Sequence, residues 1–171
     1  VVLVIGAGGA ARAIIYELSK KTNNITVLNR TVDIGRAMQL KKDFSKFVNI
    51  RIDKLSKSNL IKYITYANIV INATPVGMYP KSSKTIVEEK ILEEVNKISK
   101  IKNKLFFDAI FNPYLTLFLK ISSKKYNAKV CSGLYMMLYQ GVEAFKIWVG
   151  KDVSKTDVVF AHNTLKEMLK G

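Results

Sequence analysis

The sequence predicts an α/β fold: a doubly wound, mostly parallel sheet of six strands with helices on both faces. Three observations predict it. Short apolar runs alternate with segments of helical periodicity, and the connections between them are short. The run Ile69–Ile71 is continuously apolar, as expected for a strand buried on both faces. A glycine-rich turn joins the first apolar run directly to the first helical segment.

The first part of the chain supplies three of the expected strands. Val1–Ile5 is an uninterrupted apolar run and predicts the first strand. Ala11, Ile15 and Leu18 recur at helical spacing, so a helix is expected next. In chain order we expect the strand Val1–Ile5, the helix Ala10–Lys21, the strand Ile25–Leu28, a helix over roughly Asp33–Phe47, the strand Val48–Ile52 and a short helical turn at Leu60–Tyr63.

The second part supplies three further strands. Ile91, Leu92 and Val95 lie on one face of an amphipathic segment, which predicts a helix there. Strand and helix alternation of this kind gives parallel units, and six strands suit the order 3-2-1-4-5-6. In chain order we expect the strand Ala67–Asn72, the helix Glu88–Ile98, the strand Lys104–Asp108, the helix Leu115–Tyr126, the strand Ala128–Cys131 and the helices Leu134–Val149 and Asp157–Leu169.

The composition bounds what the chain can be. Its 171 residues, 49% hydrophobic and 24% charged, suffice for one domain with a proper core and exclude a disordered chain. A single cysteine excludes an internal disulfide and favours a reducing compartment, so we expect a cytoplasmic protein. A single histidine excludes histidine-cluster metal sites, so no metal is expected. No apolar run is long enough to span a bilayer, and no membrane partner is expected.

The net charge of +15 comes mainly from lysine. Four of the 28 basic residues are arginine, so 24 are lysine, and these are scattered along the whole chain. No basic stripe interleaved with aromatic residues is present, so we interpret the lysines as solvating the surface and expect no nucleic-acid partner. Among single residues, we expect Cys131 and Trp148 to be buried and His162 to lie at the surface.

The glycine-rich turn has the spacing of a dinucleotide-binding motif of the Rossmann fold. Gly6 is expected to permit the tight turn, and Gly8 to let a pyrophosphate approach the backbone. Ala11 is expected to let the helix lie close to the sheet. The helix N-terminus then offers free N–H groups and the positive end of its dipole to the anion. The cofactor-binding residues predicted here are Gly6, Ala7, Gly8, Gly9 and Ala10.

The end of the second strand predicts which dinucleotide binds. An Asp or Glu at this place would hold the ribose 2′-hydroxyl of NAD, but the chain has Asn29, Arg30 and Thr31. A guanidinium pairs with a 2′-phosphate, while the hydroxyl and the amide can donate hydrogen bonds to it. Arg36 is expected to be a second phosphate contact. The cofactor predicted from these four residues is NADP.

Five motifs in this order and spacing resemble the cofactor domain of the shikimate dehydrogenase family. The resemblance runs from Val1 to about Val149, and no single motif would be specific. The motifs are Gly6–Ala11, Asn29–Thr31, Asn72–Met78, Phe107–Pro113 and Gly133–Gly141.

The resemblance implies an enzyme that reduces 3-dehydroshikimate to shikimate with NADPH in aromatic amino-acid biosynthesis. Its catalytic Lys and Asp belong to an N-terminal substrate domain, so no catalytic residue is assigned within this chain. The chain starts inside a strand and without Met, so we expect a C-terminal NADP-binding domain whose N-terminal domain is missing. We expect residues 1–150 to form that domain. The helix within residues 151–171 is expected to pack on the same unit or on the missing domain, and the resemblance allows a homodimer of the full enzyme.

Further site residues follow from the strand ends and from the resemblance. Small Ala73 leaves room for the cofactor, and the Thr74 hydroxyl can hydrogen-bond its ribose. The resemblance implies that Ala109 offers its backbone near the nicotinamide, and Gly133 and Met136 complete the cofactor-binding set. Gln140 shares a helix face with Met136 and is expected to bind substrate, as is Phe111.

Three positions depart from the family pattern. Phe111 replaces a common Tyr and lacks its hydroxyl, Ile34 replaces a common basic residue, and Tyr135 replaces a small residue, which would narrow the cleft. Two alternatives stay open. One is a quinate/shikimate dehydrogenase that uses NAD. The other is a non-catalytic nucleotide-binding module.

Overall fold

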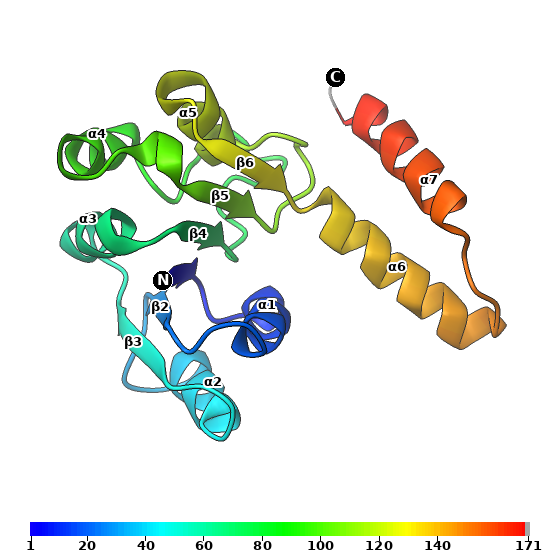
Figure 1. Cartoon of the computed structure of the whole chain (residues 1–171), viewed down its shortest axis with the longest axis horizontal. Helices are drawn as coiled ribbons and strands as arrows, with labels where there is room; N and C mark the ends of the chain where they lie inside the picture. The colour runs from blue at the N-terminus through cyan, green and yellow to red at the C-terminus, as the bar shows by residue number, and fades with distance from the viewer. Residues whose placement is uncertain (170–171) are drawn as a thin grey trace.

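The computed structural model describes residues 1–169. These residues contain one six-stranded sheet in the order β3-β2-β1-β4-β5-β6, in which every neighbouring pair of strands is parallel (Figure 1). The predicted fold class and strand order are confirmed. The strands are β1 (Val2–Ile5), β2 (Ile25–Asn29), β3 (Ile50–Lys54), β4 (Ile69–Asn72), β5 (Leu105–Asp108) and β6 (Lys129–Ser132). The helices are α1 (Gly9–Ser19), α2 (Arg36–Phe44), α3 (Lys57–Tyr66), α4 (Glu89–Ile98), the 3-10 turn η1 (Ile101–Asn103), α5 (Leu117–Tyr126), α6 (Leu134–Val149) and α7 (Lys155–Met168).

Two apolar clusters, one on each face of the sheet, hold the helices in place. On one face, α3, α4 and α5 pack against strand residues such as Leu3, Val70 and Phe106. On the other face, α1 and α2 pack against residues such as Val4 and Val27. All four residues of β1 are buried, because this strand is covered on both faces and paired on both edges. Its position in the sheet therefore explains why its sequence is uninterrupted and apolar.

The carboxyl ends of the strands meet at one edge of the sheet, where the candidate site lies. The chain turns from β1 into α1 there, and β2, β4, β5 and β6 also end at that edge because all pairs are parallel. The strand order reverses between β1 and β4. In open α/β sheets this switch point is where a crevice for ligands forms.

Several element boundaries differ from the sequence-based expectation, among them those of α2, α3 and β3. α2 starts at Arg36 rather than Asp33, because Gly35 has a left-handed φ of 74° and interrupts the helical backbone before it. α3 is a full helix rather than a short turn, and it begins after Ser56, whose hydroxyl accepts a hydrogen bond from Asn59 N. β3 lies two residues further along the chain than expected. Its register with β2 pairs Ile50 with Ile25.

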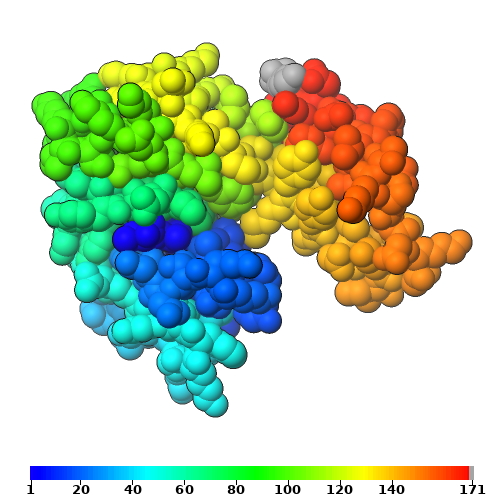
Figure 2. All heavy atoms as spheres, viewed as in Figure 1, coloured from blue at the N-terminus to red at the C-terminus, as the bar shows by residue number. Residues whose placement is uncertain are grey.

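α6 and α7 form a hairpin that stands beside the sheet (Figure 1). In Figure 2 an open cleft separates the hairpin from the part of the body that carries α1. The expectation that Trp148 is buried is wrong: it lies near the end of α6 and is 82% exposed. His162 was expected at the surface but is 6% exposed, because its ring stacks on Tyr135 of α6 at 3.8 Å between centroids. Cys131, expected to be buried, is exposed on the edge strand β6.

Among residues 1–169, no helix has both the length and the apolar character needed to cross a membrane. In the same residues, no group of three or more His, Cys, Asp or Glu side chains could hold a metal ion.

Candidate functional site

The turn between β1 and α1 combines a crowded glycine with two open ones. Gly6 has a φ of 107°, and a Cβ there would lie 2.9 Å from Ala73 O, so both the backbone angle and the space require glycine. Around Gly8 and Gly9, a Cβ would meet no atom of the described residues within 4 Å. No side chain in the described part of the chain caps the N-terminus of α1, and the first turn of α1 contains no acidic residue. The open space above an uncapped helix N-terminus fits an anionic group.

The residues on either side of this turn contribute in different ways. Ala11 is fully buried, so α1 lies close against the sheet as predicted. Ala7 is 5% exposed and contributes only its backbone to the turn. Ala10 is half-buried and packs at the edge of the apolar cluster on the α1 face. The turn therefore offers backbone atoms rather than side chains to a ligand.

The end of β2 presents basic side chains without acidic partners. Arg30 and Thr31 are exposed directly after β2, and Arg36 is exposed at the first position of α2. Within residues 1–169, neither Arg30 nor Arg36 forms an ion pair. The Asn29 amide donates to Thr31 O at 2.8 Å and so shapes this loop. Two guanidinium groups that form no ion pair within the described residues, one directly after β2 and one at the start of α2, suit a phosphate.

A shallow depression of about 510 Å³ lies beside the N-terminus of α2. It brings the positive charges of Arg36 and Lys42 and the exposed thioether of Met38 to one surface. Its lining residues are Gly35, Arg36, Met38, Gln39 and Lys42.

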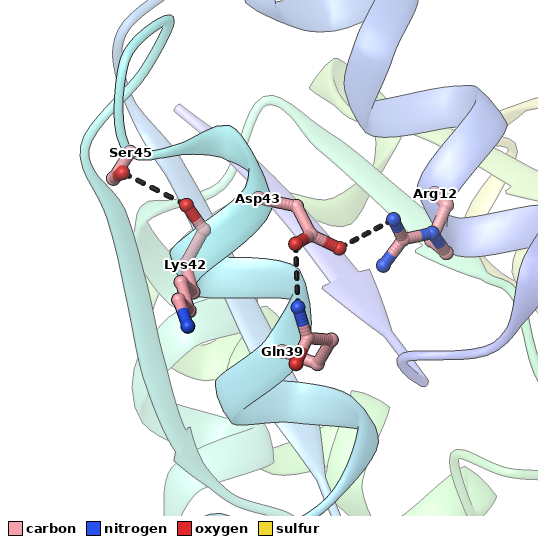
Figure 3. Close-up of polar contacts among 5 residues, drawn as sticks. All are labelled: Arg12, Gln39, Lys42, Asp43 and Ser45. Atoms are coloured by element: carbon pink, nitrogen blue, oxygen red, sulfur yellow. Dashed lines mark hydrogen bonds and ion pairs between the residues drawn. The ribbon is translucent and has the colours of Figure 1, made fainter.

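An ion pair that the sequence analysis missed holds α2 against α1. Arg12 Nη2 of α1 lies 2.5 Å from Asp43 Oδ2, and Gln39 Nε2 donates to Asp43 Oδ1 at 2.6 Å (Figure 3). The hydrogen bond from Arg12, followed in size by the one from Gln39, lowers the pKa of the Asp43 carboxyl. In the same view, Ser45 Oγ donates to Lys42 O at the end of α2. The contact joins residues 31 positions apart, so no local pattern could indicate it.

At the end of β4, the Thr74 hydroxyl that was expected to bind the cofactor ribose already forms hydrogen bonds within the protein. Thr74 Oγ1 donates to Asn72 Oδ1 at 2.7 Å and accepts from Val76 N at 3.2 Å. The hydroxyl therefore has one free lone pair left, with which it can accept a hydrogen bond from a ribose. Ala73, at 9% exposed, is small and leaves its carbonyl against Gly6, as described above.

The ends of β5 and β6 approach each other through backbone atoms. A Cβ at Gly133 would lie 2.1 Å from Ala109 O, and Gly133 N donates to Ile110 O at 3.1 Å. Gly133 was assigned to the cofactor-binding set from the sequence. The structure gives a reason for a glycine here that lies within the protein, namely the close carbonyl of Ala109. Phe111 follows on the same loop and is 37% exposed.

α6 carries the predicted substrate-binding residue Gln140 and a stack of aromatic rings that the sequence did not predict. Gln140 is exposed and Met136 is half-buried. Tyr135 was expected to narrow the cleft, but its ring is stacked on His162 of α7 and on Tyr139. α7 also reaches the loop after β5, because Lys166 Nζ lies 5.3 Å from the Tyr114 ring centroid. α7 therefore contacts both the α6 helix and the loop that carries Phe111.

A family model described as shikimate / quinate 5-dehydrogenase matches residues 1–113. The chain belongs to this family. A second model, described as the shikimate 5′-dehydrogenase C-terminal domain, matches residues 133–159. The family expected from the sequence is thus confirmed. The expectation that the whole chain is a C-terminal domain is not confirmed, because the family model described as a C-terminal domain matches only the short stretch 133–159.

Individual relatives are consistent with the family model. A shikimate dehydrogenase (NADP(+)) of Methanocaldococcus jannaschii is 40% identical over 151 residues, which are 87% of this chain and 49% of the relative. A crystal structure of shikimate dehydrogenase in complex with NADP+ has a TM-score of 0.75 and 34% identity, over 98% of this chain and 54% of that one. The structure of shikimate 5-dehydrogenase of Listeria monocytogenes, in complex with shikimate and NAD, has a TM-score of 0.73 and 28% identity, over 98% of this chain and 55% of that one. The chain thus spans about half the length of the relatives it matches.

Proposed function

We propose that this chain is the NADP-binding half of a shikimate dehydrogenase that reduces 3-dehydroshikimate to shikimate with NADPH. The proposal is carried by two exposed arginines after β2, Arg30 and Arg36, which form no ion pair within residues 1–169, and by the uncapped N-terminus of α1 with open space above it. The name of the Methanocaldococcus relative supports the choice of reaction and of cofactor. The proposal keeps the expected cytoplasmic location, with which the free thiol of Cys131 is compatible.

Each part of the site has a defined task in this proposal. The backbone amides at Gly8 and Gly9 bind the pyrophosphate, and Arg30 and Arg36 bind the 2′-phosphate. Ala73, Ala109 and the start of α6 line the nicotinamide side. The bound cofactor supplies the hydride. The protein's own groups bind, orient and shield the reactants, and Gln140 is positioned on α6 to donate to a hydroxyl or carboxylate of the substrate.

The remaining half of the protein is assigned the catalytic Lys and Asp that the family resemblance implies. Residues 1–150 bind the cofactor, and residues 151–169 together with the exposed side of α6 pack on the other half; the last two residues of the expected segment 151–171 lie outside the described residues. The exposed apolar side chains Phe145, Ile147, Trp148 and Phe160 support this assignment, because each is at least 42% exposed. This chain alone is expected to bind NADP and to show no turnover of shikimate.

A cofactor titration tests the proposed specificity. By calorimetry, NADP should bind more tightly than NAD, and Arg30→Ala should weaken NADP binding roughly 10- to 100-fold while leaving NAD binding unchanged, because a charged hydrogen bond is lost. Arg51→Ala is the matched control, since Arg51 is exposed near the amino end of β3. Equal or tighter binding of NAD would favour the NAD-dependent alternative. Absence of saturable binding of either cofactor would refute the proposal.

A second titration tests the pyrophosphate site. Gly8 has an ordinary extended φ of −84°, and a Cβ there meets no protein atom, so Gly8→Ala should fold with an unchanged melting temperature. The added methyl group should nevertheless obstruct the approach of a pyrophosphate and weaken NADP at least tenfold. Gly141→Ala, on α6, is the control for a methyl group added in open space. An unchanged affinity of the Gly8 variant would place the pyrophosphate elsewhere.

A further inference from the structure

Three polar side chains are completely buried at the carboxyl ends of β4 and β5. Asn72 ends β4, Asp108 ends β5, and Thr116 precedes α5; each is 0% exposed. Burial of a carboxyl group costs free energy unless hydrogen bonds or a cation compensate it. Within residues 1–169, no Lys, Arg or His forms an ion pair with Asp108. Hydrogen bonds must therefore account for its position.

Asp108 accepts hydrogen bonds from three different segments. Its Oδ1 accepts from Ile110 N and from Asn72 Nδ2, each at 3.1 Å. Its Oδ2 accepts from Thr116 Oγ1 at 2.7 Å. The carboxyl group thus connects the end of β4, the loop after β5 and the start of α5. Desolvation outweighs these bonds and raises its pKa.

The other two members of the network extend it into the loops. Asn72 Nδ2 also donates to Val76 O at 3.2 Å, and Asn72 Oδ1 accepts from Thr74 N at 3.0 Å. Thr116 Oγ1 caps α5 by accepting from Leu119 N. Every polar atom of these three side chains therefore has a hydrogen-bond partner. A buried polar network in this state holds its members in one geometry.

The loops held by the network lie on one side of the glycine turn. β1 stands between β2 and β4 in the sheet, so the turn after β1 separates the end of β2 from the ends of β4 and β5. A dinucleotide whose adenosine lies at the end of β2 must place its second nucleoside over β4 and β5. Ala73 and Ala109 lie there, each next to a member of the network.

We propose that Asp108, through Asn72 and Thr116, is a positioning residue that holds the loops after β4 and β5 in the geometry required by the nicotinamide half of the cofactor. The inference rests on the proposed function. It differs from a purely structural role in a measurable way. A network that only stabilises the fold would affect stability alone, or both halves of the cofactor equally. A positioning network affects the nicotinamide half selectively.

The test compares NADP with 2′,5′-ADP, which contains only the adenosine half and its 2′-phosphate. Calorimetric affinities for both ligands are measured on this chain as wild type, Asp108→Ala, Thr116→Val and Thr116→Ser. We expect Asp108→Ala and Thr116→Val to weaken NADP about tenfold and to leave 2′,5′-ADP within a factor of two. Thr116→Ser retains the hydroxyl and should restore NADP affinity.

Ser122→Ala is the matched control, because Ser122 is also fully buried on α5 and donates to Phe118 O at 2.8 Å, outside the network. It should lower the melting temperature without changing either affinity. Thr116→Val keeps the test decisive if Asp108→Ala does not fold. The inference is overturned if both ligands weaken equally, or if stability falls while NADP affinity is unchanged. Failure of the wild type to bind NADP would instead refute the proposed function.

Discussion

Glycines in this chain serve two different purposes at the scale of single residues. Gly6 and Gly133 are required by the protein itself, since a Cβ at either would approach a backbone carbonyl to within 2.9 or 2.1 Å. Gly8 and Gly9 face open space, so a ligand can approach their backbone closely. Gly6, Gly8 and Gly9 nevertheless lie in the same run of small residues. Only the neighbouring backbone distinguishes a packing glycine from a binding glycine.

Gly133→Ala should destabilise the protein by about 1–3 kcal/mol or more, because the new methyl group meets the Ala109 carbonyl and one backbone segment must move. Gly141→Ala, within the helix α6 that Gly133 precedes and in open space, should stabilise it by about 0.5–1 kcal/mol through helix propensity. Urea unfolding of the two variants and the wild type measures both changes. Equal effects of the two substitutions would contradict the close approach at Gly133.

Asp53 should make stability depend on pH in the acid range. Hydrogen bonds from Tyr63 Oη and from Lys54 N lower the pKa of its carboxyl. Because the folded pKa lies below the unfolded one, the stabilisation is present above about pH 4 and is lost as the pH falls through the lowered folded pKa. Asp53→Asn should therefore show a shallower decline in unfolding free energy between pH 5 and about 2. Parallel curves for variant and wild type would rule out this contribution.

At the scale of elements, caps and side-chain contacts decide where helices begin and what they touch. Ser56, Thr116 and Ser154 each accept a hydrogen bond from the third residue of the helix that follows, which fixes the starts of α3, α5 and α7. The sequence analysis placed the strands within two residues but shortened α3, because its polar first turn obscured the helical periodicity. Contacts between elements, such as Arg12 with Asp43, had no local signal at all.

The stack of His162 on Tyr135 should determine how firmly α7 holds to α6. The rings are 8° from parallel and His162 is buried, so His162→Ala removes a ring pair worth about 0.5–1.5 kcal/mol in addition to its buried area. Hydrogen exchange should accelerate about tenfold in α7 and remain unchanged in the sheet. His162→Phe retains a flat ring and should largely preserve protection. Acceleration spread evenly over the whole chain would contradict a local role.

For the whole molecule, the apolar surface of the α6–α7 hairpin is the feature that a self-contained domain would not expose. Ile147 and Trp148 are each 82% exposed, and Phe160 is 72% exposed. Surface of this kind marks an interaction site. It agrees with a chain that spans about half of its relatives.

The isolated chain should self-associate at high concentration through this surface. The double substitution Ile147→Ser with Trp148→Ser should reduce association in analytical ultracentrifugation and change stability by no more than about 0.5 kcal/mol, since neither side chain is buried. Val158→Ser is the contrasting control: Val158 is 6% exposed on α7, so this variant should lose stability. Undiminished association of the double variant would point to a different surface.

The amino-acid sequence by itself determined the fold class, the strand order and the place of the glycine turn. These follow from local patterns: apolar runs, helical periodicity and turn residues lie within a few positions of each other along the chain. It also placed Arg30 directly after the second strand and Arg36 within the following helix, and the structure has both exposed. Tertiary structure alone decided that Asp108 meets Asn72 and Thr116, that Trp148 is exposed and that His162 is buried. Such outcomes depend on which distant segments meet in space, and periodicity within one segment carries no information about its partner.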